Sequence, residues 1–371
     1  MTINPLEASI TEANPEVVTL VRLAKGWSKK RLADSANVSS AHVSRVELGK
    51  LRLVGRPLLD YARALDCRPA LLCVDYQPSP PEGTHYRKHA TVAEWKRLRA
   101  WAGANLAALR VGRILALADY EPALSLPSLP PEDYEAEEAE ITVAQVLRRM
   151  WRLHGRISDM TALLEAAGIF VIYSDFGDSV VDAATIRGRD GCPPIIIVNR
   201  DLPADRLRMT LGHELGHLVM DTDESLASPD EIERRATSFA AEFLAPYEEI
   251  AAALERVTPR TLHELDELRM VWGVSQSSLV KRAYQRELFT EHRYRSMFRL
   301  LNDSGRLYGE RGGVDREKAS LIDRFVSGLS GAGYEPAEID TITLANDQQR
   351  ADAFGIVPRA DPTPRRHLAI I

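Results

Sequence analysis

Two histidines separated by three residues stand in the middle of the sequence, within MTLGHELGHLVMD. His213 and His217 lie just over one helical turn apart, so on a helix both imidazoles leave the same face and can bind one tetrahedral zinc ion. Glu214, next to the first histidine, can reach a zinc-bound water and act as its general base. The spacing predicts a zinc-dependent hydrolytic site. HExxH also occurs by chance, as two surface histidines on a core helix. The presence of a third ligand therefore decides whether the motif is a zinc site.

The third ligand is expected in the next helical segment, SPDEIERRATSFAAEFLAP. Glu233 lies three residues before Ala236, on or near the face that the apolar residues of this segment bury. Glu242 competes with it, although a solvated or ligand-supporting carboxylate is the expected role there. Glu231 is expected to belong to a charged first turn. A carboxylate in third place, where a closed structural site would favour cysteine, indicates a catalytic zinc.

HELGH followed by E-x-x-A-x-x-F-A-A-E-F-L-x-P closely resembles the ImmA/IrrE family of metallopeptidases. The resemblance implies that Glu233 completes a zinc site with His213 and His217, and that the substrate is a protein. It extends upstream over PPIIIVNRDLPADRLRMTLGHELGH, where residues 195–198 are expected to form an edge strand that could pair with an extended substrate. One departure is HLVMDTDE, which lacks the additional histidine often found after HELGH in that family.

The resemblance also continues downstream, where residues 261–286 and 291–301 are expected to be helical. The GVS sequence at residues 273–275 opens either a second helix-turn-helix-like pair or, in the interpretation we favour, a helical cap packed on the peptidase. An oxyanion would need a stabilising group besides zinc, and the sequence leaves three candidates open. These candidates are Tyr284, Tyr294 and His263.

The elements that position these residues follow from hydrophobic periodicity, β-branched content and flanking glycine or proline. The fold is expected to be mainly α with a small β-sheet (α+β), with a zincin-like peptidase domain at its centre. Strands are expected in IFVIYS, DAATIRG and PIIIVNR. Helices are expected at residues 143–154, 158–167, 203–220 and 229–244.

A second pattern lies near the N-terminus, in VVTLVRLAKGWSKKRLADSANVSSAHVSRVELGK. Apolar residues recur at helical spacing over three short helices. Ser28 and Ser39 can cap the second and third helices, residues 37–39 form a tight turn, and Gly49 ends the third helix. Two small helices joined by such a turn can place one helix in the major groove of DNA. Residues 17–72 resemble the XRE-type (Cro/repressor-like) helix-turn-helix family.

This second resemblance implies that the third helix reads double-stranded operator DNA. Arg45 is the only long donor at the reading positions and could make two hydrogen bonds to guanine, whereas Lys29 and Lys50 would hold phosphates. Arg22 and Glu47 match a structural ion pair of that family. The alternative is a domain for dimerisation or protein docking that never touches DNA. The predicted DNA-binding residues are Lys29, Ser39, Ser40, Ala41, Ser44, Arg45 and Lys50.

Charge is distributed unevenly along the 371 residues, whose formal net charge is -6. Between positions 22 and 56, nine cationic residues face two acidic ones, a local net charge of +7. This asymmetry indicates a nucleic-acid-binding end joined to another domain. No apolar run approaches the roughly 20 residues of a membrane span, and no secretory signal is visible. Three cysteines make no disulfide framework, so we expect a cytoplasmic protein without a membrane partner.

Proline clusters and changes of composition divide the chain into expected domains. The acidic, proline-rich stretch at residues 121–140 is interpreted as an exposed linker. The first three parts expected are a helix-turn-helix domain at 14–76, a helical connector with this linker at 77–140, and a metallopeptidase domain at 141–255. A helical segment at 256–311 follows. The C-terminal region at 312–371 has no known role and contains one amphipathic segment at 316–329.

Together these expectations describe a DNA-binding transcriptional regulator with a built-in zinc endopeptidase. The family resemblance implies cleavage of a repressor, either a partner or the protein itself, in a stress, phage or mobile-element response. Helix-turn-helix proteins usually act on two half-sites, which suggests a homodimer. One alternative is a DNA-binding antitoxin or repressor whose peptidase-like domain only senses or binds a partner. Another is a metal-dependent sensor with a structural zinc, against which the general base Glu214 argues.

Overall fold

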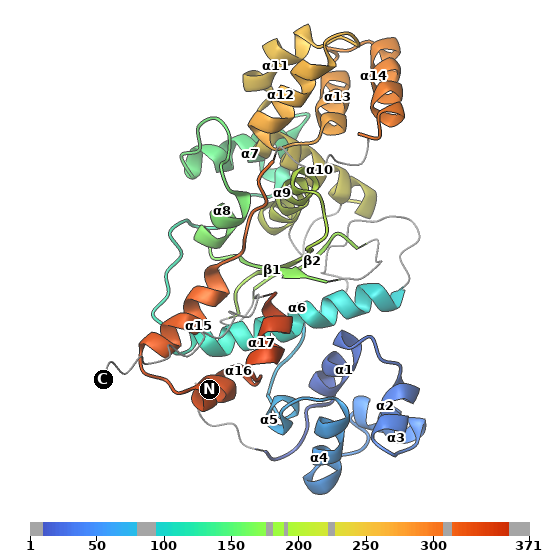
Figure 1. The fold of residues 1–371 in the computed structure, drawn as a ribbon, viewed down its shortest axis with the longest axis vertical. Coiled ribbons are helices and arrows are strands. Elements are labelled where there is room, and N and C mark those ends of the chain that lie inside the picture. The colour runs from blue at the N-terminus through green and yellow to red at the C-terminus, as the bar shows by residue number, and fades with distance from the viewer. Residues whose placement is uncertain are drawn as a thin grey trace, which may run out of the picture.

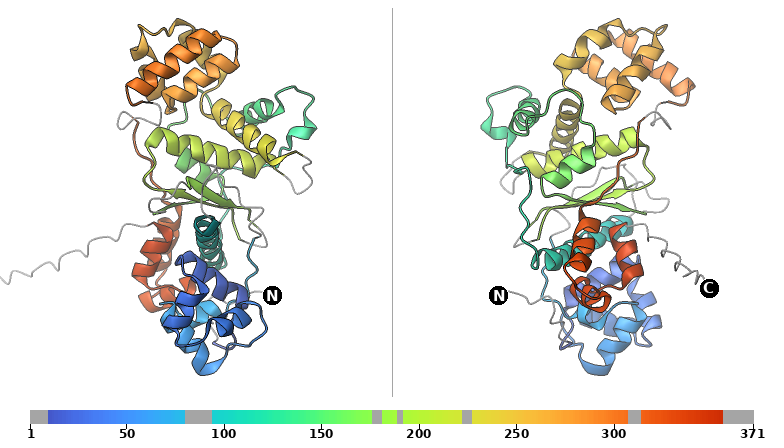
Figure 2. Two further views of the ribbon diagram at one scale, coloured as in Figure 1. Left: turned by 90° about the vertical axis from the view of Figure 1, so that its right-hand side faces the viewer. Right: turned by 60° about the vertical axis from the view of Figure 1, so that its left-hand side comes forward.

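A computed structural model describes residues 10–79, 94–175, 181–188, 192–221, 227–306 and 314–355. These residues form a mainly helical fold with one small three-stranded sheet, which confirms the predicted α+β class. The elements are stacked in layers, from the N-terminal helices through one long helix, the sheet and the paired central helices to a helical cap (Figure 1, Figure 2). No helix within these described ranges has both the length and the apolar character needed to cross a bilayer.

The N-terminal module consists of five helices around one buried core. As predicted, the side chains of Ser28 and Ser39 cap the second and third helices by accepting backbone N–H groups. Asn37 takes φ +54° in the turn between them, and Gly49 takes φ +66° after the third helix. The helices are α1 (Pro15–Ala24), α2 (Lys29–Ser35), α3 (Ser40–Glu47), α4 (Gly55–Ala64) and α5 (Pro69–Leu72).

The predicted connector helix, α6 (Glu94–Leu115), is a structural layer in its own right. One side carries Trp101 and Leu109 into the core of the N-terminal module. The opposite side carries Ala104, Ala108 and Val111 into the core beneath the sheet. Small alanine side chains allow the helix axis to approach the strands closely. As Figure 1 shows, α6 therefore joins the N-terminal module to the central domain by packing.

The sheet has the order β1-β3-β2, with strands β1 (Phe170–Ser174), β2 (Ala183–Ile186) and β3 (Ile195–Asn199). β3 runs parallel to β1 and antiparallel to β2. The prediction of an edge strand at residues 195–198 is therefore wrong. β3 is the central strand, all of its residues are buried, and its backbone groups are paired on both sides. A continuous apolar run such as IIIV is typical of a strand covered on both faces.

Four helices surround the sheet on the side away from α6. α9 and α10 are packed against each other, and α9 also contacts β3 and β2. Both agree with the predicted helices to within one residue at each end. The four helices are α7 (Ala139–Met150), α8 (Met160–Ala166), α9 (Ala204–Met220) and α10 (Pro229–Leu244).

The interpretation of residues 121–140 as an exposed linker is wrong for its apolar members. Leu124 and Leu129 pack against the central core, and the backbone N–H of Leu129 donates to the carbonyl of Val219 at 2.7 Å. Pro131 is buried at the start of the short 3-10 helix η2 (Pro131–Asp133). The segment is largely irregular apart from η2, and its leucines hold it against the domain.

The helical cap continues the chain after α10, and it shares the central hydrophobic core. Val280, Phe289 and Met297 are buried in that core, which agrees with the cap interpretation of residues 273–275. The predicted helix over residues 261–286 is broken at Gly273, which takes φ +65°. The cap consists of α11 (Tyr247–Arg256), α12 (Leu262–Trp272), α13 (Gln276–Gln285) and α14 (Glu291–Asp303).

The C-terminal region returns along the molecule to pack on α6 and β1. Its start is held by two buried carboxylates: Glu317 accepts the backbone N–H groups of Met160 and Thr161 at the beginning of α8, and Glu165 accepts those of Ser320 and Leu321. One helix was expected there and three are found, α15 (Leu321–Gly331), α16 (Pro336–Thr343) and α17 (Asp347–Phe354). Residues 356–371 lie outside the described part.

Candidate metal centre

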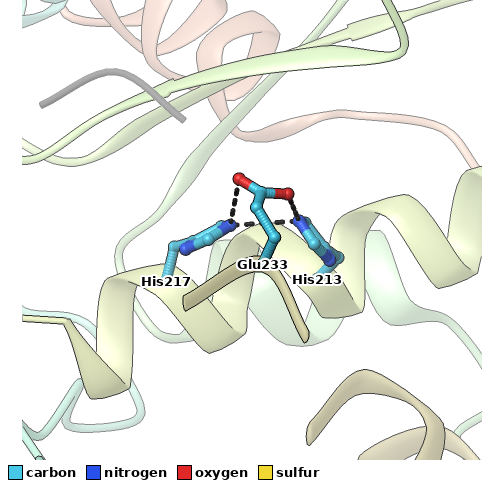
Figure 3. Close-up of side chains that lie close together, drawn as sticks. All are labelled: His213, His217 and Glu233. Atoms are coloured by element: carbon cyan, nitrogen blue, oxygen red, sulfur yellow. Dashed lines mark hydrogen bonds and ion pairs between the residues drawn. The ribbon is translucent and has the colours of Figure 1, made fainter. Parts of the chain in front are cut away.

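The two histidines of HELGH project from the same face of α9. His213 and His217 are 1% and 0% exposed, and their Nε2 atoms lie 3.0 Å apart. The rings are nearly perpendicular, with centroids separated by 4.6 Å. Each ring therefore directs a nitrogen toward one common point above the helix (Figure 3).

Glu233 reaches the same point from the neighbouring helix α10 (Figure 3). Its Oε2 atom lies 3.4 Å from Nε2 of His213, and its Oε1 atom lies 3.8 Å from Nε2 of His217. One donor atom from each of the three residues falls within 4.8 Å of the others. Two imidazole nitrogens and one carboxylate are the donor set of a catalytic zinc site with three protein ligands. The Glu233 side chain is 26% exposed, so this side of the cluster meets solvent.

Two glycines on α9 allow α10 to come this close. A Cβ at Gly216 would lie 3.0 Å from Cδ1 of Phe239 and 3.3 Å from Cα of Ala236. A Cβ at Gly212 would lie 3.2 Å from Cβ of Ala240. Glycine inside a helix costs about 1 kcal/mol relative to alanine. At these two positions the absence of a side chain allows the close helix contact that brings Glu233 near the histidines.

Further side chains fix the orientation of the imidazole rings. Nδ1 of His217 lies 2.6 Å from Oδ2 of Asp221, and Nδ1 of His213 lies 3.3 Å from Oγ1 of Thr237. Such partners set the tautomer, so that Nε2 keeps its lone pair for a metal. Burial, helped by the nearby His213, also holds the pKa of His217 well below its usual value, against the opposing effect of Glu233. His217 is therefore neutral at pH 7.

Sequence reasoning did not identify Asp221 or Thr237. The amino-acid sequence could have indicated Asp221 as a partner of His217, because Asp221 follows it by four residues and lies on the same helical face. Thr237 follows Glu233 by four residues on α10 and could have been indicated in the same way. Arg187, directly after β2, was also missed; it donates to the carbonyl of His217 at 2.5 Å. The end of β2 is thus tied to the helix that carries both histidines.

Glu214 is fully buried on α9, between the two histidines in sequence. The competing acidic residues lie elsewhere. Glu242 was expected to be a solvated or ligand-supporting carboxylate, and its burial excludes the solvated role. It lies against Arg282 and accepts a hydrogen bond from Nε2 of Gln145 at 3.0 Å. Glu231 belongs to the charged first turn of α10, where hydrogen bonds from the neighbouring Arg234 lower its pKa to about 2.

The three oxyanion candidates all lie in the helical cap. Tyr284 and Tyr294 stack against each other with ring centroids 4.4 Å apart. His263 is exposed on α12. The described contacts therefore give no reason to prefer one of them.

The residues predicted to contact DNA lie on α2, α3 and the adjoining turns. Ser40, Ala41, Arg45 and Lys50 are exposed, and Ser44 is half-buried. The hydroxyl of Ser39 accepts the N–H of His42 as the cap of α3.

The expected ion pair of this module is present. Nε of Arg22 donates to Oε1 of Glu47 at 2.5 Å, and both side chains are buried. Nζ of Lys29 lies 3.4 Å from Oε2 of the same glutamate. Lys29 is therefore partly neutralised within the module.

Residues 164–284 match the peptidase family described as the IrrE N-terminal-like domain. The matched stretch begins in α8, ends in α13, and contains both histidines, Glu214 and Glu233. It covers less than half of the chain and leaves out the N-terminal module. Comparison with curated proteins and with solved structures gives no match. The match supports the predicted peptidase part.

Proposed function

We propose that this protein is a DNA-binding regulator that carries a zinc-dependent endopeptidase. The observation that carries the enzymatic part is the convergence of His213, His217 and Glu233 from two packed helices, within a stretch that matches a peptidase family. The donor set suits zinc, because imidazole nitrogen and carboxylate oxygen are its usual ligands in hydrolytic sites. A bound zinc would polarise the scissile carbonyl and lower the pKa of a coordinated water to about 7.

The residues around the cluster have distinct roles in this proposal. Glu214 accepts the proton of the attacking water and delivers it to the leaving amine. Asp221 and Thr237 hold the two imidazole rings in the tautomers that point Nε2 at the metal. The partial exposure of Glu233 leaves an approach for the substrate. The burial of Glu214 keeps its proton transfer away from bulk water.

The substrate is proposed to be a protein segment that binds in extended form. β2 is an edge strand among the described residues and is tied to α9 through Arg187. An extended chain can add to such an edge through main-chain hydrogen bonds. In this proposal the extended substrate pairs with β2, and not with residues 195–198 as the amino-acid sequence had suggested.

The N-terminal module is proposed to bind operator DNA through α3, with two copies of the chain on two half-sites. Its supports are the local charge of +7, the two capped helices with a tight turn, and the exposure of Arg45 and Lys50. The cleaved protein is then a repressor, either a partner or the chain itself. A module that only senses a partner is less consistent with a buried glutamate beside a metal ligand.

The substitution Glu214→Gln tests the enzymatic part. It keeps the size and the metal ligands but removes the base, so zinc should remain bound while cleavage is lost. Wild-type and variant chains would be expressed in the same cells, and the newly formed protein N-termini compared by mass spectrometry. N-termini produced only with the wild type support the proposal. Identical N-termini in both samples, with zinc bound in both, would contradict it.

A further inference from the structure

A groove away from the metal cluster lies beside α6, where the N-terminal module, the sheet and the C-terminal helices meet. Its volume is about 1190 Å³, and its walls come from α1, α6, strands β1 and β3, and the C-terminal helices. Neither histidine of the cluster, nor Glu214 or Glu233, lines it. Figure 1 shows these elements meeting around α6.

One face of α6 forms a wall of this groove. Arg99, Gly103, Leu106 and Arg110 all line it, and their spacings of four, three and four residues put them on the same helical face. The two arginines are separated by roughly 16 Å along the axis, at 1.5 Å per residue. Between them the lining is small or apolar, with Ile197 of β3 opposite Gly103.

Arg110 has an unusual environment. Its Nε atom is shielded from solvent and has no hydrogen-bond partner, and among the described residues its guanidinium forms no hydrogen bond or ion pair. Four other arginines have a similarly buried Nε, but each is held through its Nη atoms by a carboxylate or a carbonyl. These four are Arg208 with Glu317, Arg282 with Glu242, Arg293 with the carbonyl of Val257, and Arg350 with Asp340.

Arg110 as a whole is half-buried, but its Nε has lost water without gaining a hydrogen-bond acceptor, which is costly for a charged group. Burial accordingly lowers the pKa of Arg110 to about 10. Native proteins usually avoid such a group unless it has a function. An anion from solution would supply the missing partner.

Two more cations line the groove. Lys25 and Arg110 both act electrostatically on the Cys67 thiol, and Cδ of Arg99 lies against Gly26, next to Lys25. Neither Lys25 nor Arg99 forms an ion pair within the described ranges. Lys25 and Arg110 thus lie near the carboxylate of Asp66. The lining as a whole carries six cations, Lys25, Arg99, Arg110, Arg200, Arg316 and Lys318, and five carboxylates, Asp66, Asp175, Glu317, Asp323 and Asp352, an excess of one positive charge.

We propose that this groove binds a small organic phosphate, with the phosphate group at Arg110 and Lys25 and the apolar part over Gly103 and Leu106. Arginine is well suited to bidentate binding of phosphate. The bound molecule would contact the N-terminal module, α6 and the sheet together, and so would link the occupancy of this site to the packing of the DNA-binding module. The inference does not depend on peptidase activity.

Phenyl phosphate is a suitable probe, because it combines a dianion with an apolar ring. Its binding to the full-length chain would be measured by calorimetry, with inorganic phosphate and sodium chloride of equal ionic strength as comparisons. The substitution Arg110→Met keeps an apolar side chain of similar length. We expect it to weaken binding about tenfold or more, which is the scale of one lost charge-assisted interaction.

Two controls remove a positive charge elsewhere. Arg45→Ala alters the proposed DNA surface, and Arg149→Gln alters an exposed position on α7; both should bind phenyl phosphate as the wild type does. Loss of binding in Arg45→Ala with retention in Arg110→Met would overturn the proposal in favour of the DNA surface. No binding to the wild type would overturn it directly. If inorganic phosphate binds as tightly as phenyl phosphate, the proposal that the ligand has an apolar organic part would be overturned.

Thermal stability without ligand gives an independent readout. Removing a partly buried charge that has no partner should raise the melting temperature, so ligand-free Arg110→Met should melt above the wild type. A lower melting temperature would show that Arg110 has a structural partner, and would contradict the premise of the proposal.

Discussion

At the scale of single residues, the metal cluster depends on side chains that orient two imidazoles and on burial that keeps His217 neutral. Asp221, 2.6 Å from Nδ1 of His217, fixes the orientation of that ring, whereas burial favours its neutral form. A lowered pKa leaves the lone pair of His217 free over the whole physiological range. The cluster is therefore prepared to receive a cation before one binds.

Asp221 can be tested apart from the ligands. The substitution Asp221→Ala should weaken zinc binding by about 10- to 100-fold, the usual effect of removing the partner of a ligating histidine. Affinity would be measured by competition with a chromogenic chelator. Asp230→Ala removes an exposed carboxylate from the first turn of α10 and should leave the affinity unchanged. Equal affinities of Asp221→Ala and the wild type would show that His217 needs no partner.

The amino-acid sequence predicted much of the cluster because helical spacing is local. An i, i+4 pair of histidines shares a face whatever the surrounding fold. Glu242 shows the limit of this reasoning. Its burial depends on Arg282, which lies 40 residues further along the chain. Such a contact leaves no trace in local spacing, so local spacing could not exclude a solvated carboxylate at this position.

At the scale of elements, the packing of α9 on α10 sets the distance between the histidines and Glu233. Gly212 and Gly216 form the contact surface. The two helices were predictable from their periodicity. The position of β3 was not, because strand order is decided by contacts between distant segments. β2 and β3 both contain β-branched residues, and only their pairing shows which is central.

Gly216→Ala tests this packing. The added methyl group would press on Phe239, at an overpacking cost of about 1–3 kcal/mol, offset by about 1 kcal/mol of helix propensity. We expect no gain in the free energy of unfolding, measured in urea, and weaker zinc binding, because α10 must move away. Gly328→Ala on α15 meets open space and should stabilise the protein by about 0.5–1 kcal/mol. Equal stabilisation by both substitutions, with unchanged zinc affinity, would contradict this account.

At the scale of the whole molecule, segments that looked like separate parts are packed together. α6 lies between the N-terminal module and the sheet, the proline-rich segment adheres to the central core, and the C-terminal helices return to α6. Composition suggested a linker because proline and acid dominate it. The leucines between them were too few to predict packing from sequence alone. The N-terminal module and the metal cluster are therefore connected through packed elements.

The proposed DNA-binding role belongs to this scale as well. An operator would first be selected from random duplexes with the full-length chain. Arg45→Ala should then weaken binding to that operator by roughly 1–3 kcal/mol and relax the preference at one base pair. Lys50→Ala should weaken binding to all sequences and reduce the salt dependence. Failure to enrich any sequence would contradict the regulator proposal. An equal loss on every sequence with Arg45→Ala would make Arg45 a phosphate contact.

The central claim is that His213, His217 and Glu233 hold one zinc ion. The most direct test is the metal content of the full-length chain, purified without chelators, beside Glu233→Ala and the matched variant Glu231→Ala on the same helix. We predict about one zinc per chain in the wild type and in Glu231→Ala, and its loss in Glu233→Ala. A wild-type chain that carries no zinc and regains none when zinc is added, or a Glu233→Ala variant that keeps it, would contradict the account.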